Sequence, residues 1–502
     1  MTLAVTYSRA LIGVDAPLVT VEVHLSGGLP GMSIVGLPET AVRESRDRVR
    51  SALINAHFDM PAMRITINLA PADLPKEGGR YDLPIALGIL AASGQIPMDK
   101  LAQYEFLGEL SLAGELRSVS AVLPAAIAAH AAGRILVVPL ANGDEAALPG
   151  DCTVLAPDHL LALCAHLHGR EILPDHHAQL QPEPVNYPDM ADVKGQPQAR
   201  RALEIAASGE HNLLYVGSPG AGKTMLAKRL PGLLPELEGV DALEVAAVHS
   251  IGGQWQSSRW RQRPFRDPHH TASPVAMVGG GSRPRPGEVS LAHGGVLFLD
   301  ELPEFQRQVL EVLRQPLESG EIVIARAAQK LRFPARFQLV AAMNPCPCGY
   351  LDDKQRACRC SPEQVHRYQA KISGPLLDRI DMHVPVQPVV AHVLLNAPAE
   401  ESSAIIRQRV IATRQRQLVK RGVLNSQLAG QDLDAACGLS TEDRQFLEAT
   451  LQKLHFSARA FHRILRLART IADMAEQEHV SREALAEAIS YRYLDRERSV
   501  GG

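Results

Sequence analysis

The chain has 502 residues, of which 46% are hydrophobic and 21% are charged. One hydrophobic core does not grow to that size, so the length predicts about three domains. The formal net charge of -3 excludes a basic field over the whole molecule, and it restricts any nucleic-acid contact to local clusters of Lys and Arg.

The sequence shows neither a membrane span nor a secretion signal. No apolar run is long enough to cross a bilayer, and the first residues lack the basic, apolar and small-residue regions of a signal peptide. Seven cysteines do not make a secreted disulfide framework in a chain of this length. We therefore expect a protein of the reducing cytoplasm that has no membrane partner.

The first 170 residues have the pattern of a mixed α/β domain. Apolar runs predict strands over 18–23 and 64–69, and helical periodicity predicts helices over 39–56 and 83–92. The segment that follows is polar and rich in proline, without a clear period. It predicts a linker over 171–190.

Two further domains are expected after the linker. From 191 to 394 short apolar strands alternate with helical stretches, which predicts a parallel sheet covered by helices. From 395 to 502 the strand patterns end and a helical domain is expected. Its predicted helices cover 402–416, 441–454, 458–475 and 481–490.

A phosphate-binding motif, G-x-x-x-x-G-K-[ST], follows a short apolar strand and precedes a helical stretch. Glycines in such a loop let backbone N–H groups face the phosphates, and the helix N-terminus adds partial positive charge. We expect Lys223 to contact the β- and γ-phosphates of ATP and the Thr224 hydroxyl to bind Mg²⁺. The predicted nucleotide-binding residues are Gly217, Ser218, Pro219, Gly220, Ala221, Gly222, Lys223 and Thr224.

The segment GVLFLDEL at 295–302 predicts a buried strand that ends at two acids. Asp300 is expected to bind ATP-associated Mg²⁺, and Glu301 to orient and polarise the water that attacks the γ-phosphate. A strand ending in acids is ordinary by itself. Together with the phosphate-binding loop it predicts ATP hydrolysis.

Two more polar residues are candidates for the catalytic site. Asn344 follows the predicted strand at 338–343, where its amide is expected to position the attacking water. Arg379 lies in the segment GPLLDRID, and an arginine supplied across a subunit boundary stabilises the charge of the transition state. The alternative for Arg379 is a local ion pair with Asp378 or Asp381.

Arg459 is a further candidate, because it stands in the first turn of a long amphipathic helix that Ser457 is expected to cap. From there we expect it to reach the nucleotide. Arg463 and Arg466 are rivals at helical spacing. The alternative is that all three form a solvated basic face.

Four of the seven cysteines stand in one loop, residues 346–360, as two C-x-C pairs. Four thiolates can surround Zn²⁺ tetrahedrally, and the polar segment between the pairs cannot form a core of its own. We expect a structural zinc; reduced thiols or reversible disulfides are the alternative. His269, His270 and His293 are not assigned to a metal. The predicted ligands are Cys346, Cys348, Cys358 and Cys360.

These motifs, taken together, resemble the magnesium-chelatase-like AAA+ ATPases and most closely the bacterial ComM/YifB family. The likeness covers nearly the whole chain and includes ADVKGQ, HNLLYVGSPGAGKTMLA, RPFRDPHHTASPVAMVGGG, GGVLFLDELPEF, NPCPCGY and SGPLLDRID. It implies an AAA+ core with a helical lid and hexameric rings. It also implies that Asn344 is sensor 1, Arg379 a finger acting on a neighbour, and Arg459 sensor 2.

The N-terminal segment resembles the chelatase-type relative of the Lon protease domain, an α/β domain of the S5 domain 2-like class. The runs GLPGMSIVGLPETAVRES and GGRYDLPIALGILAASGQIP carry this likeness. Lon-type proteolysis needs a serine nucleophile and a lysine base. Tyr81 stands where the serine is expected, and residues 116–138 contain no lysine, so the sequence argues against proteolysis.

Basic residues gather in three loops that are candidates for contact with DNA phosphates. The resemblance implies an insert at 277–287 and a hairpin at 321–332, and both carry arginines. The third loop interleaves Arg259, Arg261, Arg263 and Arg266 with aromatic residues. The alternative is that these cations pair with carboxylates between subunits. The predicted DNA-contacting residues are Arg283, Arg285, Arg326, Lys330 and Arg332.

The leading hypothesis is therefore an ATP-driven, ring-forming DNA translocase. The ComM resemblance implies that it promotes branch migration during natural transformation. The second hypothesis is a chelatase-like remodeller of a protein partner, to which DNA is irrelevant. An ATP-dependent protease is the third, and the missing serine–lysine pair argues against it.

Overall fold

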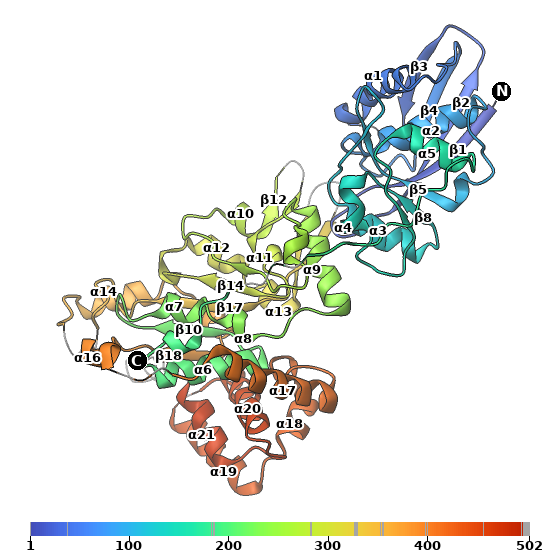
Figure 1. Ribbon diagram of the computed structural model, residues 1–502. Coiled ribbons are helices and arrows are strands. Elements are labelled where there is room, and N and C mark those ends of the chain that lie inside the picture. Colours follow the sequence, from blue (N-terminus) through green and yellow to red (C-terminus); the bar gives the residue numbers. More distant parts are fainter. Residues whose placement is uncertain are drawn as a thin grey trace. The chain divides into compact units, whose positions relative to one another are not determined.

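A computed structural model describes residues 2–37, 39–181, 183, 186–281, 284–325, 330–351, 353, 356–396, 398, 400–454, 456–492 and 494 (Figure 1). The chain forms two compact units, and each is made of segments that are not contiguous in sequence. The first comprises Met1–Glu183, Gly239–Trp260 and Ala325–Phe333; the second comprises Pro184–Glu238, Arg261–Ile324 and Pro334–Gly502. Among the described residues no helix is both long and apolar enough to cross a bilayer.

The first unit contains a four-stranded sheet in the order β1-β2-β4-β3. Strand β2 (Leu18–Ser26) alternates between buried and half-buried side chains, as expected for a strand with one face in the core. The helix α2 (Asp82–Ala92) is buried on all sides, and Gly88 lets it approach Val23 of β2 closely. The other elements are β1 (Thr2–Arg9), β3 (Gly31–Val35), β4 (Arg64–Ala70) and α1 (Thr40–Asn55).

A second, parallel sheet in this unit has the order β5-β8-β9. The inserted helix α9 (Gly239–Ile251) packs against α3, and Ser250 donates a hydrogen bond to the buried carboxylate of Glu145. Trp255 and Trp260 pack with Leu123 in the same cluster. The elements are β5 (Tyr104–Phe106), β6 (Glu109–Leu110), β7 (Leu116–Arg117), β8 (Ile135–Val137), β9 (Val154–Leu155), α3 (Val122–Ala131), α4 (Gly143–Ala146) and α5 (Leu160–Leu167).

The second unit is built on a five-stranded parallel sheet in the order β11-β14-β17-β10-β18. The three central strands are buried along their whole length, as strands covered on both faces must be. The predicted parallel sheet is thereby confirmed. The strands are β10 (Leu213–Val216), β11 (Phe265–Arg266), β14 (Val296–Leu299), β17 (Gln338–Met343) and β18 (Met382–Pro385).

Short elements connect these strands. Two small sheets, β12 with β13 and β15 with β16, lie where an insert and a hairpin were expected. Their bounds are β12 (Gly279–Gly280), β13 (Arg285–Pro286), β15 (Glu321–Ala325) and β16 (Lys330–Pro334). The helices are α6 (Pro197–Gly209), α7 (Lys223–Ala227), α8 (Leu230–Leu233), α10 (Pro274–Val278), α11 (Glu288–Leu291), α12 (Arg307–Val312), α13 (Pro316–Ser319), α14 (Pro362–Gln369), α15 (Gly374–Leu377) and α16 (Ala391–Asn396).

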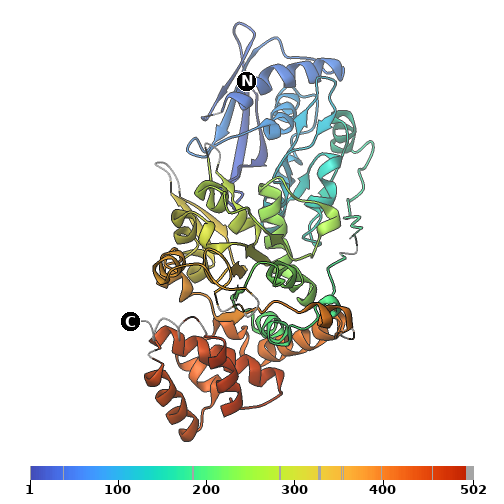
Figure 2. The ribbon, with the colours of Figure 1, turned by 90° about the vertical axis from the view of Figure 1, so that its left-hand side faces the viewer.

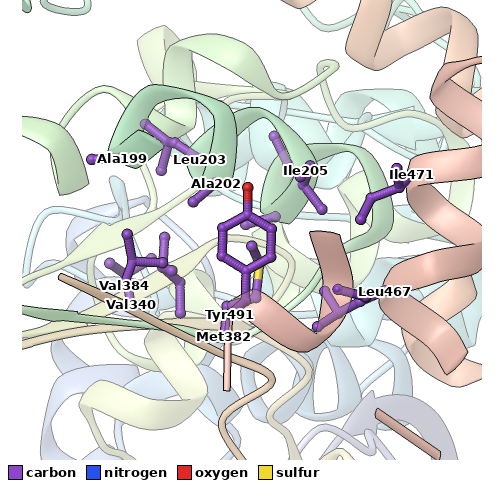
Figure 3. Packing of buried hydrophobic residues seen from close by; sticks show 14 of the residues in the cluster. Ala199, Ala202, Leu203, Ile205, Val340, Met382, Val384, Leu467, Ile471 and Tyr491 are labelled. Atoms are coloured by element: carbon purple, nitrogen blue, oxygen red, sulfur yellow. The ribbon is translucent and has the colours of Figure 1, made fainter. Parts of the chain in front are cut away.

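The C-terminal residues form helices that gather in one group, coloured orange to red in Figures 1 and 2. All four predicted helices are confirmed, and α18 (Gly430–Cys437) is one the sequence patterns missed. In Figure 3 Leu467 and Ile471 of α20 lie in the same core as Tyr491 and residues of α6. The predicted helices are α17 (Ser403–Arg421), α19 (Thr441–Lys453), α20 (Ala458–Met474) and α21 (Arg482–Ser490).

His211, fully buried between α6 and β10, makes the stability of this unit depend on pH. Its Nε2 lies 2.7 Å from Thr470 Oγ1. Burial lowers the pKa of His211 from 6.5 to about 4; Asp381 raises this pKa, and Arg466 and Arg463 lower it. Between pH 6.5 and about 4, His211 binds a proton in the unfolded chain but stays neutral in the folded chain. The folded state should therefore lose about 3 kcal/mol as the pH falls from 6.5 to 4.

Replacing His211 with Gln should remove this contribution. The free energy of unfolding, measured by urea denaturation of the full chain, should then fall less steeply between pH 6.5 and 4 than in the wild type. His130→Gln changes an exposed histidine and serves as the matched control. Equal pH slopes for wild type and His211→Gln would show that His211 is not the titrating group.

Candidate nucleotide-binding site

The candidate site lies at one end of the five-stranded sheet, at the carboxyl ends of three parallel strands. Gly217, Asp300 and Asn344 directly follow β10, β14 and β17. The register pairs Val216 with Met343, so these strand ends lie side by side. Because the carboxyl ends of parallel strands share one edge, segments far apart in sequence meet there.

A cavity of about 400 Å³ occupies this edge. The structure thus brings the predicted loop, both acids and Asn344 together around one space. Gly217, Ser218 and Ala221 do not line it but shape the loop beneath; a Cβ atom at Gly217 would meet the carbonyl oxygen of Val386. The lining residues are Pro219, Gly220, Gly222, Lys223, Thr224, Met225, Asp300, Glu301, Met343 and Asn344.

Lys223 is held in the cavity by neutral oxygen atoms. Its Nζ donates to the carbonyl oxygens of Gly217 (2.7 Å) and Ser218 (3.1 Å) and to Asn344 Oδ1 (3.1 Å). Burial lowers the pKa of Lys223, and the charges of Asp300 and Glu301 raise it. A partly desolvated ammonium with neutral partners attracts an anion strongly, so this position fits a phosphate group.

Thr224 and Asp300 turn hard oxygen atoms to the same space. Thr224 Oγ1 donates to Asp300 Oδ2 at 2.6 Å, and Asp300 Oδ1 accepts from the Glu301 N–H at 2.9 Å. A hydroxyl and a carboxylate next to a phosphate position are the donors that a partly hydrated Mg²⁺ takes. The residues present therefore fit the ion predicted from the sequence.

Asp267 is a nearby acid that the sequence patterns did not single out. It follows β11, whose end lies at the same edge of the sheet as the end of β14. Desolvation raises the pKa of Asp267, and so does the charge of Asp300, while Lys228 lowers it. Its position after an adjacent parallel strand was the available signal, but β11 has only two residues and shows no period.

Glu301 has a left-handed backbone, with φ of 52°, and its carboxylate faces a pair of histidines. Glu301 Oε2 lies 3.4 Å from His270 Nδ1. The ring of His270 lies 4.2 Å from that of His269 and meets Phe305 edge-on. A left-handed conformation costs free energy for a residue other than glycine. The sequence did not predict this contact.

Arg379 lies at the opposite end of the same sheet, where the parallel strands begin. It precedes β18, whose first residue, Met382, pairs with Leu213 at the start of β10. The length of β10, about 13 Å at 3.3 Å per residue, therefore separates it from its own phosphate-binding loop. Its side chain, 7% exposed, forms an ion pair with Glu318. Arg379 therefore pairs with Glu318 and not with Asp378 or Asp381, the two acids named as alternative partners.

Arg459 and Arg463 take those two acids instead. Arg459 Nη1 lies 3.4 Å from Asp378 Oδ2, and Arg463 forms an ion pair with the buried Asp381. Their helix, α20, packs on α6 and α21, and the first turn of α20 lies beside Asp378. The expectation that Arg459 reaches a nucleotide stays a prediction.

The four loop cysteines come together immediately after Asn344. All are free thiols, and the four Sγ atoms lie within 4.8 Å of one another. Gly349, which has φ of +84°, ends the turn that carries the first pair; a Cβ atom there would lie 2.5 Å from Pro219 Cδ. The cysteine loop therefore packs directly against the phosphate-binding loop.

Two of the three basic loops keep exposed cations. Arg285 in β13 and Lys330 and Arg332 in β16 are exposed, whereas Arg283 and Arg326 lie outside the described residues. In the third loop three of the four arginines have partners within the chain, and its contact with DNA stays a prediction. Arg261, Arg263 and Arg266 contact respectively Glu238, the carbonyl oxygens of Pro235 and Gly294, and Glu288.

In the first unit, the lysine and serine side chains that could form a Lon-type dyad make contacts other than with each other. Tyr81 is buried, and Lys76, also buried, donates to the carbonyl oxygen of Pro71. The hydroxyl of Ser111 accepts a hydrogen bond from the Glu115 N–H at 3.0 Å. Lys76 and Ser111 are thus not paired with each other as base and nucleophile.

Comparison with known proteins agrees with this geometry. Family models of magnesium chelatase subunit ChlI match residues 189–394, 21–142 and, for its C-terminal part, 400–492. Competence protein ComM of Haemophilus influenzae is 51% identical over 503 residues, covering 99% of this chain and 98% of that protein. YifB of Escherichia coli is 51% identical over 505 residues with the same coverage. The 38 kDa magnesium-chelatase subunit of Rhodobacter capsulatus is 30% identical over 171 residues, 30% of this chain and 49% of the subunit. The chain therefore belongs to the magnesium-chelatase-like ComM/YifB family.

Proposed function

We propose that the protein is a cytoplasmic AAA+ ATPase that assembles into a hexameric ring and uses ATP hydrolysis to move branched DNA. The observation that carries the ATPase part is the cavity in which Lys223, Thr224, Asp300, Glu301 and Asn344 meet. The family model of magnesium chelatase subunit ChlI supports it, because it matches residues 189–394, which contain all five residues.

We assign a role to each residue at the cavity from its residue type and its contacts. Lys223 and the loop N–H groups bind the phosphates, and Lys223 exchanges its carbonyl partners for phosphate oxygens. Thr224 and Asp300 hold Mg²⁺, which neutralises phosphate charge when it is bound. Glu301 orients the attacking water, and Asn344, whose Oδ1 lies 3.1 Å from Lys223 Nζ, helps to position it.

A ring is supported by where the arginines lie. Arg379 and Arg459 gather at the sheet edge opposite the chain's own cavity, with Glu318 and Asp378 as partners. A guanidinium stabilises transition-state charge only when it reaches the γ-phosphate. From this edge they serve the cavity of a neighbouring subunit, so ATP turnover requires assembly, and Arg459 acts as sensor 2 from the same side as the finger.

DNA is supported as the substrate by exposed cations and by one relative. Arg285 in β13 of the insert and Lys330 and Arg332 in β16 of the hairpin are exposed. Basic loops bind phosphate backbones without sequence preference. The Haemophilus relative is named a competence protein, which favours a role in natural transformation; branch migration is the DNA activity that we propose for this role.

The test compares ATP turnover with and without forked DNA and follows strand displacement on the same substrate. DNA should bind and stimulate turnover, and Lys223→Ala, which removes the phosphate contact, should abolish both turnover and displacement. If DNA does not bind and does not change the rate of ATP turnover, the DNA role is wrong, and the chelatase-like remodeller remains as the proposed function. That rival would be recognised by a single protein partner that stimulates turnover.

Removing hairpin cations should weaken DNA binding in a salt-dependent way. In Arg285→Ala and Lys330→Ala, the slope of log K against log salt should fall by about one for each phosphate that the variant no longer neutralises. Binding is measured by fluorescence anisotropy on one forked DNA at several salt concentrations. Lys420→Ala, an exposed cation of α17, is the control and should keep the wild-type slope. An unchanged slope in the hairpin variants would place the DNA elsewhere.

A further inference from the structure

The sulfur atoms of the four loop cysteines are spaced for a metal and not for disulfides. Cys346 Sγ lies 3.4 Å from Cys348 Sγ and 3.7 Å from Cys358 Sγ, and Cys348 Sγ lies 3.6 Å from Cys358 Sγ. A disulfide needs about 2.05 Å. Four thiolates at about 2.3 Å from a tetrahedral zinc lie about 3.8 Å apart. These three distances are close to the edges of a zinc tetrahedron, and Cys360 Sγ lies within 4.8 Å of the other three sulfur atoms.

The surroundings of the cluster suit thiolates. The backbone N–H of Cys360 donates to Cys358 Sγ at 3.5 Å. Such N–H groups orient metal-bound sulfur and offset its negative charge. Four thiolates complete the tetrahedron and leave no open position for a substrate, so an ion here is structural and zinc is the ion such a set selects.

The cluster touches the nucleotide-binding cavity at two points. Asn344, which lines the cavity, is two residues from Cys346. The turn closed by Gly349 N–H and the carbonyl oxygen of Cys346, 2.9 Å apart, lies against Pro219 of the phosphate-binding loop. Gln369 Nε2 also donates to the carbonyl oxygen of Pro345, at 3.1 Å. A displacement of the turn would therefore move both Asn344 and the loop.

We propose that Cys346, Cys348, Cys358 and Cys360 bind one Zn²⁺ ion, and that this ion holds the turn at 345–349 against the phosphate-binding loop so that tight nucleotide binding depends on the metal. The second half rests on the proposed function. On binding, the thiols release their protons to solvent and the ion joins two chain segments. The stretch between the two cysteine pairs is mostly polar, so it offers little apolar surface to hold those segments together without the ion.

The first experiment measures the metal. Full-length protein, purified without added metal and passed over a desalting column, should contain about one Zn²⁺ per chain by elemental analysis. The double variant Cys348→Ser/Cys358→Ser should lose it. Cys152→Ser changes an isolated, half-buried cysteine of the first unit and should keep it. Metal-free wild type, or zinc retained by the double variant, would overturn the site.

The second experiment measures nucleotide affinity without relying on turnover. Equilibrium binding of a fluorescent ATP analogue should weaken about tenfold or more in the double variant and in wild type stripped of zinc by a mercurial reagent, and added Zn²⁺ should restore only the stripped wild type. Gly349→Ala keeps every thiol but places a Cβ atom against Pro219; it should retain zinc and still bind the analogue more weakly. Thermal unfolding of each variant shows whether it is folded.

The outcomes separate the two halves of the proposal. Zinc-free protein that is folded and binds the analogue with wild-type affinity would overturn the coupling and leave ATP binding intact. Wild type that contains zinc but binds no analogue would overturn the proposed ATPase, and the coupling with it, while the metal count would still establish the site.

Discussion

Replacing Arg379 with Ala should lower ATP turnover by about a thousandfold or more, because an arginine finger contributes 10³ to 10⁵ to kcat. The affinity of a single subunit for ATP should stay nearly unchanged, since Arg379 lies at the sheet edge away from that subunit's own cavity. Steady-state turnover and equilibrium binding of an ATP analogue measure the two effects separately. Glu318→Gln removes the ion-pair partner but keeps the guanidinium, and it should retain turnover.

Mixing two inactive variants tests whether the arginine acts on a neighbour. Arg379→Ala subunits keep an intact cavity, and Glu301→Gln subunits keep an intact Arg379. In mixed rings some boundaries combine the intact cavity with the intact arginine, so turnover should return. Mixtures that stay as inactive as their components, although rings form, would mean that Arg379 does not act across the boundary.

Glu301→Gln should bind ATP with near wild-type affinity and hydrolyse it about a hundredfold to ten-thousandfold more slowly, the range for removal of a general base. Gln preserves the shape of the side chain and the backbone at φ of 52°, but an amide does not polarise water as a carboxylate does. Single-turnover hydrolysis beside analogue binding measures the effect. Glu304→Gln alters a nearby acid that pairs with Lys371 and should keep normal turnover. Fast hydrolysis by Glu301→Gln would assign the water to another group.

The phosphate-binding edge was predictable because its signals are local. The loop at 217–224 and the acids at 300 and 301 each follow a short apolar strand, and Asn344 follows another. Parallel strands bring their carboxyl ends to one edge whatever the loops between them do. Strand type and order along the chain were therefore enough to predict that these residues meet, although not their hydrogen bonds.

Contacts between remote segments were not predictable in the same way. Glu318, the partner of Arg379, lies in a different element, and nothing in the spacing singles it out among the acids. The sequence likewise did not predict that the segment Gly239–Trp260 belongs to the first unit, because the strands before and after it belong to the second. Trp255 and Trp260, two of the aromatic residues of the third basic loop, are packed with Leu123.

The sequence by itself determined which chemistry the chain carries: the loop, acids and cysteines are short patterns whose residue types are set by phosphate, magnesium and thiolate chemistry. Only the tertiary structure decided at which end of the sheet the arginines lie, which partner each one takes, and that the two C-x-C pairs converge beside Pro219. The reason is physical. A local pattern depends on neighbours within a few residues, whereas a pairing across the fold depends on how helices and strands pack, and many sequences of the same pattern pack differently.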